Sequence, residues 1–171
     1  MINRILRKIF IRSFEQKRKY LIKHGSKIGS NTRILSDIDS FGSEPYLIEI
    51  GDKCLISRDV LFLTHDGGIT VLNNLNLFEK RMDKLSRIII GNNCFIGARS
   101  IIMPGVTIGN NVIIGAGSIV TKDVDDNCVI CGVPAKKIKS IDDYFNDMKE
   151  KVYPTAGMSE SEKCEYCRDN V

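Results

Sequence analysis

The sequence predicts an all-β solenoid, because a six-residue repeat fills the stretch from Ile90 to Asp125. The stretch divides into IGNNCF, IGARSI, IMPGVT, IGNNVI, IGAGSI and VTKDVD, each beginning with an apolar residue. A helix turns by about 100° per residue, so a repeat of six would scatter these residues around a helix. Six is a multiple of the two-residue period of a strand, so short strands would point all of them the same way. Three hexads then form one triangular coil.

The same repeat continues, with interruptions, before residue 90. Hexads IGSNTR (28–33) and ILSDID (34–39) precede a break near Pro45, and IGDKCL, ISRDVL and FLTHDG resume it over 50–67. We therefore expect the solenoid domain over 25–139. Residues 66–87 do not keep the phase of the repeat, so they must leave the solenoid as a loop with little regular structure. A loop this long inside a compact domain is usually functional.

The segment before the solenoid, residues 1–24, is predicted to be an amphipathic basic helix. Apolar residues such as Ile2, Ile5 and Ile9 share one face, and basic residues occupy another. Two interpretations remain open. Either the apolar face packs on the end of the solenoid and the basic face is solvated, or the helix lies on an anionic membrane surface.

The segment after the solenoid, residues 140–171, is predicted to contain one short helix and an acidic tail. Ile141, Tyr144, Phe145 and Met148 would share one face of a helix over 140–151. The tail SESEKCEYCRDNV is charged and poor in core residues. We expect it to be weakly ordered.

Composition indicates a soluble, cytoplasmic protein of one domain. The chain has 171 residues, no apolar run long enough to cross a membrane and a net charge of only +4. We expect no nucleic-acid partner. The six cysteines follow the hexads or the tail, so reduced thiols are expected. A four-thiolate zinc site built from Cys128, Cys131, Cys164 and Cys167 is the alternative, but we expect no metal.

The run from Cys94 to Lys139 carries the strongest functional signal. It contains IGARSIIMPGVTIGNNVIIGAGSIVTKDV and ends with GVPAKKIK, and with the earlier hexads and a His-bearing loop it closely resembles the hexapeptide-repeat acyltransferases. The resemblance implies a left-handed parallel β-helix, a homotrimer with active sites between subunits, acetyl-CoA as the acyl donor and a histidine base.

The resemblance assigns the base to His65. This residue lies in FLTHDGG, where the solenoid gives way to the loop, whereas His24 at a helix end is expected to be structural. A neutral imidazole can take the proton of an acceptor hydroxyl and return it to the departing thiolate. Asp66 is the candidate for orienting the ring, and a backbone N–H at Gly97–Ala98 is the candidate donor to the oxyanion.

The resemblance also implies positions that contact coenzyme A. Small residues at two corners would let the pantetheine arm approach the backbone, and lysines near the end of the repeat would meet the phosphates, although ordinary solvated lysines are the alternative. The candidate residues are Gly97, Ala98, Gly115, Ala116, Thr121, Lys122, Pro134, Ala135, Lys136, Lys137 and Lys139.

The favoured function is O-acetylation of a sugar hydroxyl in cell-surface polysaccharide biosynthesis. The long loop and the lead-in GSEPYLIEIG resemble those of O-acetyltransferases that act on such sugars. Acetylation of an antibiotic such as chloramphenicol or a streptogramin, of serine or of an amino-sugar nucleotide stays open, as does a purely structural solenoid. A zinc carbonic anhydrase of similar fold needs three histidines, and this chain has two.

Overall fold

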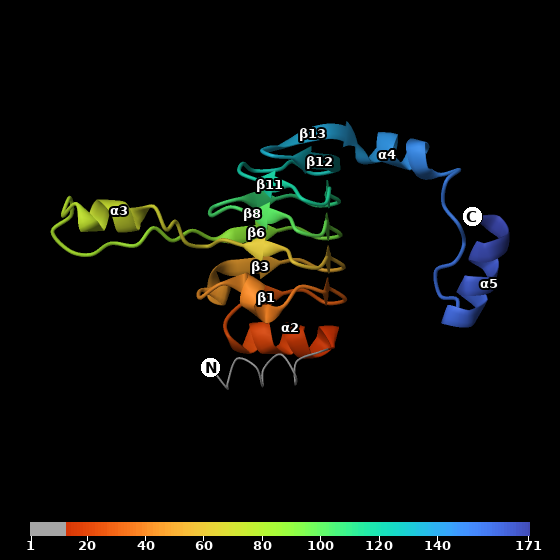
Figure 1. Cartoon of the computed structure of the whole chain (residues 1–171), viewed down its shortest axis with the longest axis horizontal. Coiled ribbons are helices and arrows are strands. Elements are labelled where there is room, and N and C mark those ends of the chain that lie inside the picture. Colours follow the sequence, from red (N-terminus) through yellow and green to blue (C-terminus); the bar gives the residue numbers. More distant parts are fainter. Residues whose placement is uncertain (1–12) are drawn as a thin grey trace. The chain divides into compact units, whose positions relative to one another are not determined.

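Short strands stack into three sheets that form the sides of a coiled column (Figure 1). The computed structural model describes residues 13–171, and the chain divides after Ile141 into two units, which we describe separately. The first twelve residues of the predicted basic helix lie outside the described residues.

The sheets of the first unit are named here A, B and C. Neighbouring strands are parallel, except that the last two strands of sheet B form an antiparallel hairpin. Sheet A holds β1 (Lys27–Ile28), β3 (Ile48–Ile50), β6 (Ile88–Ile90) and β9 (Thr107–Ile108). Sheet B holds β2 (Arg33–Ile34), β4 (Leu55–Ile56), β7 (Phe95–Ile96), β10 (Ile113–Ile114), β12 (Cys128–Gly132) and β13 (Ala135–Ser140). Sheet C holds β5 (Leu61–Phe62), β8 (Ile101–Ile102) and β11 (Ile119–Val120).

From β3 to β11 the chain visits the sheets in the order A, B, C and then returns to A, so each round forms one coil. In the first round the 3₁₀ helix η1 (Ile38–Phe41) takes the place of a strand in sheet C. In the regular part, residues 18 apart in sequence lie one above the other, as three hexads predict. The separation is 22 between the first two coils and 40 between the second and third. The first separation exceeds 18 because η1 and the 3₁₀ helix η2 (Pro45–Leu47) lie within that coil. The second exceeds 18 because the excursion leaves the coil between β5 and β6.

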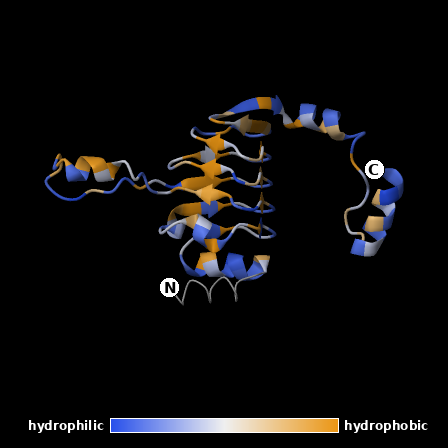
Figure 2. Ribbon diagram, in the orientation of Figure 1, coloured by the Kyte–Doolittle hydropathy of each residue, from blue (hydrophilic) through white to orange (hydrophobic). Residues whose placement is uncertain are grey.

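The repeated apolar residues fill the inside of the stack. Figure 2 shows hydrophobic strands following one another from coil to coil. The inward side chains of sheet B are fully buried at Ile34, Ile56, Ile96 and Ile114. Because each of these isoleucines pairs in register with the next, identical side chains stack in a column. A change of side-chain volume in this column would therefore leave a cavity or a clash between neighbouring coils.

One corner of the coils, between sheets A and B, is closed by side chains. The N–H of Ser30 donates to Asp52 Oδ1 at 2.6 Å, that of Asp52 to Asn92 Oδ1 at 2.8 Å, and that of Asn92 to Asn110 Oδ1 at 2.9 Å. The N–H of Asn110 continues the series to Asp126 Oδ1 at 2.7 Å. Each coil thus supplies the acceptor for the corner N–H of the preceding coil, and we call this series the A–B ladder.

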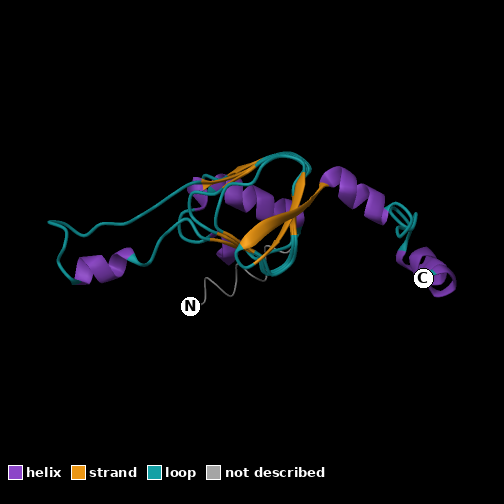
Figure 3. Ribbon diagram, turned by 90° about the horizontal axis from the view of Figure 1, so that it is seen from above, coloured by secondary structure: helices purple, strands orange, loops and turns teal. Residues whose placement is uncertain are grey.

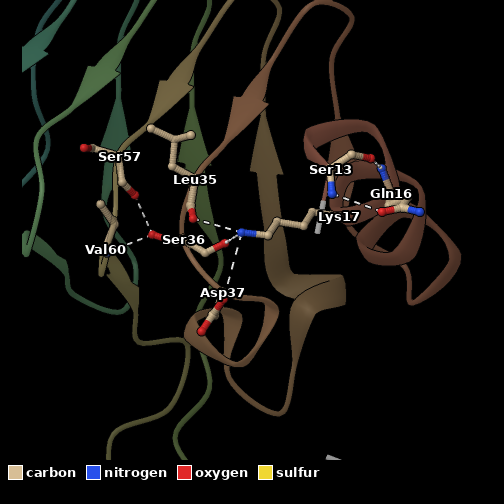
Figure 4. Close-up of polar contacts among 8 residues, drawn as sticks. All are labelled: Ser13, Gln16, Lys17, Leu35, Ser36, Asp37, Ser57 and Val60. Carbon is tan, nitrogen blue, oxygen red and sulfur yellow. Dashed lines mark hydrogen bonds and ion pairs between the residues drawn. The ribbon is translucent and has the colours of Figure 1, made fainter. Parts of the chain in front are cut away.

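Helix α2 (Phe14–Lys23) covers the first coil. Ser13 and Gln16 form a capping box at its start (Figure 4). Leu21 is buried in the core, and Lys17 Nζ donates to the carbonyl oxygens of Leu35 at 2.9 Å and Ser36 at 2.8 Å (Figure 4). Burial lowers the pKa of Lys17.

The neighbouring Arg18 donates to the carbonyl oxygen of Gly29 at 2.9 Å and to that of Ile28 at 3.2 Å. Two basic side chains of α2 therefore satisfy carbonyl groups of the first coil, for which no preceding coil supplies donors. This part of the helix packs on the end of the stack, as the first of the two interpretations expects, but Lys17 and Arg18 bind the coil where that interpretation expected a solvated basic face.

The excursion over residues 63–87 extends away from the coils as an arm (Figures 1 and 3). We expected little regular structure, but the arm contains the short helix α3 (Ile69–Asn74). Its two limbs meet at the base, where His65 and Leu85 form an antiparallel bridge. Ser86 N–H donates to the Thr64 carbonyl oxygen at 2.9 Å, so both limbs are held beside the stack.

The second unit, Asp142–Val171, follows the first residue of helix α4 (Ile141–Met148), the short helix expected after residue 140. The weak order predicted for the tail is wrong, because it contains helix α5 (Glu160–Asn170). Ser159 and Glu162 form a capping box at its start, and this local signal outweighs the charged composition. Across residues 13–171, no helix combines the length and apolar character needed to span a bilayer.

Candidate active site

His65 lies at the corner between sheets C and A, three residues after β5 ends at Phe62. It borders an open hollow of about 370 Å³ on the outside of the coils. The hollow combines residues from both limbs of the excursion with corner residues of the next two coils. Its lining is Leu63, His65, Asp66, Gly67, Lys84, Met103, Pro104 and Thr121.

The imidazole of His65 lies between two carboxylates. Its Nδ1 is 3.7 Å from Glu44 Oε1, and its Nε2 is 3.8 Å from Asp83 Oδ1. Glu44 is largely buried and accepts a hydrogen bond from Thr64 Oγ1 at 2.9 Å, whereas the His65 side chain is 43% exposed. The ring therefore has a fixed carboxylate on its Nδ1 side and an accessible Nε2.

Sequence reasoning missed Glu44. It precedes η2, in the part of the first coil where the repeat is interrupted, far from His65 in the sequence. The acidic residue beside Pro45 in that break was the available signal, but the hexad pattern gives no register for a segment that lies outside it.

Asp66, the predicted orienting residue, points elsewhere. Its carboxylate accepts hydrogen bonds from Lys84 Nζ at 2.9 Å and from the Gly68 N–H at 3.0 Å. The Lys84 hydrogen bond is the main reason that the pKa of Asp66 is lowered. Asp66 thus anchors the base of the arm, and Glu44 is the carboxylate that faces Nδ1.

A second group of candidates lies at the corner between sheets B and C. Gly97 N–H donates to the Ile114 carbonyl oxygen at 2.8 Å, and Gly115 N–H donates to that of Ile130 at 2.9 Å. Neither glycine N–H is available to a ligand. By contrast, no acceptor within residues 13–171 is paired with the N–H of Ala98 or Ala116. These two alanines, stacked one coil apart, present the donors of this corner.

The glycines allow that stacking. A Cβ at Gly97 would lie 2.5 Å from the Ala116 backbone nitrogen, closer than a real carbon atom approaches. Any side chain there would push the two coils apart and move the Ala116 N–H. The glycine of the hexad is thus required by contact between coils, with no need for a positive φ.

One chain does not bring the two groups together. Thr121 borders the hollow of His65, but Ala98 and Ala116 precede strands β8 and β11, and the hollow lies after them. Sheet C therefore separates His65 from the alanine corner. The remaining candidates lie near the last coil: Lys122, Ala135 and Lys137 line a smaller hollow, Pro134 lies between β12 and β13, and Lys136 and Lys139 lie on β13.

Of the six cysteines, Cys131 lies beside Gly115 at the alanine corner, where a Cβ on that glycine would come within 2.8 Å of the Cys131 Cβ. All six are free thiols, and Cys54 and Cys94 are buried in the core. Cys128 is buried, whereas Cys131 on the same strand is half-buried. No cluster of three or more His, Cys, Asp or Glu side chains suited to a metal ion occurs within residues 13–171.

Comparison with known proteins identifies the class of these coils. The family model described as the hexapeptide repeat of succinyl-transferase matches residues 87–122. An acetyltransferase with hexapeptide repeats from Vibrio cholerae, solved with acetyl-CoA, superposes with a TM-score of 0.55 at 25% identity. The match covers 68% of this chain and 60% of that one.

Two curated relatives extend the match over most of the chain. Protein CapG of Staphylococcus aureus is 54% identical over 145 residues, which cover 82% of this chain and 81% of CapG. The galactoside O-acetyltransferase of Escherichia coli is 39% identical over 132 residues, covering 74% of this chain and 63% of that enzyme. The chain belongs to the hexapeptide-repeat acyltransferase family, as its hexads predicted.

Proposed function

We propose that the protein is an acetyl-CoA-dependent O-acetyltransferase whose acceptor is a sugar hydroxyl, in the synthesis of a cell-surface polysaccharide. The observation that carries the proposal is the His65 ring, which has a fixed carboxylate at Nδ1 and an accessible Nε2 beside a hollow. An Escherichia coli relative is a galactoside O-acetyltransferase, and a solved neighbour contains acetyl-CoA, which supports both the acceptor class and the donor.

In the proposed reaction His65 Nε2 accepts the proton of the acceptor hydroxyl while the hydroxyl oxygen forms a bond to the thioester carbonyl carbon. The Ala98 N–H donates a hydrogen bond to the resulting oxyanion. When the carbon–sulfur bond breaks, the imidazolium returns its proton to the thiolate, so no proton is gained or lost. Glu44 faces Nδ1 and stabilises the imidazolium between these steps.

The proposed assembly is a homotrimer of left-handed β-helices. In one chain sheet C separates His65 from Ala98, so a complete site needs the alanine corner of a neighbouring protomer. Exposed apolar side chains on the outer faces, such as Leu61, Leu63 and Phe95, suit packing between copies. A monomer in gel filtration at micromolar concentration would contradict the trimer, and the handedness follows the family.

The coenzyme contacts follow the same proposal. Ala116 would donate its N–H to the pantetheine arm, next to the thioester carbonyl that the Ala98 N–H contacts. Gly97 and Gly115, which have no side chain, allow the close spacing of the coils that positions these two N–H groups. The lysines of β13 and Lys122, near the last coil, would meet the phosphates as flexible positive charges.

Membrane contact through residues 1–24 stays a prediction, together with a cytoplasmic location at the inner face. Lys17 and Arg18 bind the end of the coils, so within the described part of that segment they are unavailable to lipid. Lys19 and Lys23 are exposed. Co-sedimentation with anionic liposomes at low salt tests the contact, and no binding would reject it.

The decisive experiment measures release of the coenzyme A thiol from acetyl-CoA with methyl glycosides, nucleotide sugars, serine and chloramphenicol as acceptors. We expect turnover with a sugar, and we expect the rate of thiol release by His65→Ala to be lower by a factor of about 10²–10⁴. Gel filtration and thermal melting of the variant establish that it assembles and folds. Undiminished turnover by folded His65→Ala would end the assignment of the base, and preference for serine or chloramphenicol would replace the sugar.

A further inference from the structure

Asp83 lies on the returning limb of the arm and faces the side of His65 where the reaction takes place. Its Oδ1 is 3.8 Å from Nε2, the nitrogen that is not directed to Glu44. Within residues 13–171, the ion pair with His65 is the single one that Asp83 makes. The reaction proposed above gives this carboxylate no task, although it lies beside the atom that takes the proton.

The backbone on both sides of Asp83 is anchored. Asn73 makes a two-way contact with Met82: its Nδ2 donates to the Met82 carbonyl oxygen at 2.8 Å, and its Oδ1 accepts from the Met82 N–H at 2.9 Å. On the other side, the Lys84 carbonyl oxygen accepts from the Asp66 N–H at 2.9 Å, and the Lys84 side chain bonds to the Asp66 carboxylate at 2.9 Å.

Asp83 is thus an exposed carboxylate on a fixed backbone. Its side chain is 70% exposed, so it is available to a ligand. The ammonium group of Lys84, its neighbour in sequence, is engaged by Asp66. The geometry therefore presents a negative charge beside Nε2.

We propose that Asp83 is a specificity-determining residue that accepts a hydrogen bond from a second hydroxyl of the acceptor, adjacent to the one that is acetylated. The inference rests on the proposed sugar acetylation and names the acceptor class as a neutral vicinal diol.

The distances fit this class. The acetylated hydroxyl would lie about 2.8 Å from His65 Nε2. Because Asp83 Oδ1 is only 3.8 Å from the same nitrogen, it lies close to that hydroxyl and to the groups beside it. Adjacent hydroxyl oxygens of a sugar ring are separated by about the length of one hydrogen bond, ~2.8 Å. One hydroxyl can therefore donate to His65 while its neighbour donates to Asp83.

The Asp83 carboxylate favours a hydroxyl next to the acetylated one and disfavours an anionic group there. An ionised carboxylate only accepts hydrogen bonds, so it suits a hydroxyl donor. A carboxylate or phosphate of the acceptor placed there would face a like charge. Asp83 thus selects against acceptors with an anionic group next to the acetylated hydroxyl.

The test is a cycle of enzyme and substrate changes. Thiol release and product formation are measured for the wild type, Asp83→Ala and Asp83→Asn. The acceptors are methyl glycosides of galactose, glucose, mannose and N-acetylglucosamine, with the monodeoxy derivatives of whichever is acetylated. The matched control is Glu79→Gln, another acid of the same arm that has no ion pair with His65.

Asp83→Ala should lower kcat/KM for the parent sugar by about tenfold, the effect of losing one hydrogen bond to a charged group. The monodeoxy derivative that lacks the second hydroxyl should already have a kcat/KM about tenfold below that of the parent sugar with the wild type. Asp83→Ala should not lower the kcat/KM of that derivative further. The KM for acetyl-CoA, the melting temperature and the activity of Glu79→Gln should stay unchanged.

Three outcomes would overturn the inference. An equal loss for every acceptor, including slow hydrolysis by water, would show that Asp83 acts on His65 or on the fold. No loss for any acceptor would show that it is not used. A wild type that hydrolyses acetyl-CoA through His65 but acetylates no sugar would reject the sugar acceptor itself and the diol with it. Failure of the parent proposal is thus distinguished from failure of the inference alone.

Discussion

The corner between sheets A and B and the corner between sheets B and C start from the same Ile-Gly pair but treat the next N–H in opposite ways. In the A–B ladder the N–H of Asn92 is bound by Asn110 from the following coil. At the equivalent positions of the other corner, Ala98 is followed one coil later by Ala116, which has no side-chain oxygen, and both N–H groups keep no internal acceptor within residues 13–171.

Under the proposed function, this difference separates a structural corner from a corner that binds a ligand. A small change of side chain, from asparagine to alanine, leaves the backbone path unchanged but converts an internal hydrogen bond into a donor for a ligand. Hexads that look alike by their apolar residues therefore differ in what their corners can bind, and exchanging the two side chains should exchange the behaviour.

Of the changes that compare the two corners, closing the open corner should have the largest effect. In Ala116→Asn the new side-chain oxygen can accept the Ala98 N–H, as that of Asn110 accepts the Asn92 N–H. We expect kcat/KM for acetyl-CoA to fall about tenfold to a hundredfold, because the donor is lost to the ligand. Steady-state kinetics with varied acetyl-CoA measures this, with melting temperature as the control for folding. Unchanged kinetics in a folded trimer would mean that the Ala98 N–H is not used.

Opening the closed corner should affect stability and leave catalysis intact. Asn92→Ala removes the acceptor of the Asp52 N–H, which lies 2.8 Å from Asn92 Oδ1. This corner is exposed and water can replace the lost partner, so we expect a loss of about 1 kcal/mol in the free energy of unfolding. Urea denaturation measures the loss. A changed KM for acetyl-CoA would contradict the separation between the two corners.

The smallest expected effect concerns charge on the outer face of sheet A. Hydrogen bonding to Lys27, followed by contact with Arg87, lowers the pKa of Glu49 below its usual 4.5. The contribution of Glu49 to the free energy of unfolding is therefore complete above about pH 4.5. It is lost as the pH falls through the lowered pKa of Glu49 in the folded protein. Because these ion pairs are partly exposed, Glu49→Gln should cost less than about 1 kcal/mol at pH 7.

The pH series sharpens the contrast with the A–B ladder. The difference between wild type and Glu49→Gln should shrink as denaturation is repeated from pH 7 to pH 3. The difference between wild type and Asn92→Ala should persist, because the amide of Asn92 does not titrate. A Glu49→Gln difference that is constant with pH would show that its ion pairs add nothing to stability.

The spacing of the hexads predicted the coils, the position of the excursion and the corner that holds His65. It could not predict Glu44, because 3₁₀ helices outside the repeat bring that residue to the ring. The repeat also treats Gly97 and Ala98 as one corner. Only the hydrogen bonds between coils show that the glycine N–H is occupied and the alanine N–H is not.

The helix in the tail was missed for a different reason. The prediction for the tail used its overall composition and did not consider the capping box of Ser159 and Glu162, which starts α5. The direction of Asp66 was also beyond the sequence, since Lys84, which binds it, comes from the far limb of the arm. The hexad period and the capping box can thus be identified in the sequence, whereas the contact between Lys84 and Asp66 across the arm cannot.

The lysine and arginine that bind the first coil have a consequence for assembly. A stack of parallel strands ends in backbone groups that can pair with a strand of another molecule, the route by which sheets grow into fibres. Lys17 and Arg18 occupy those carbonyl groups with side chains that cannot be extended into a further strand. The same contacts that fix α2 therefore leave those carbonyl groups unavailable to a strand of another molecule at this end.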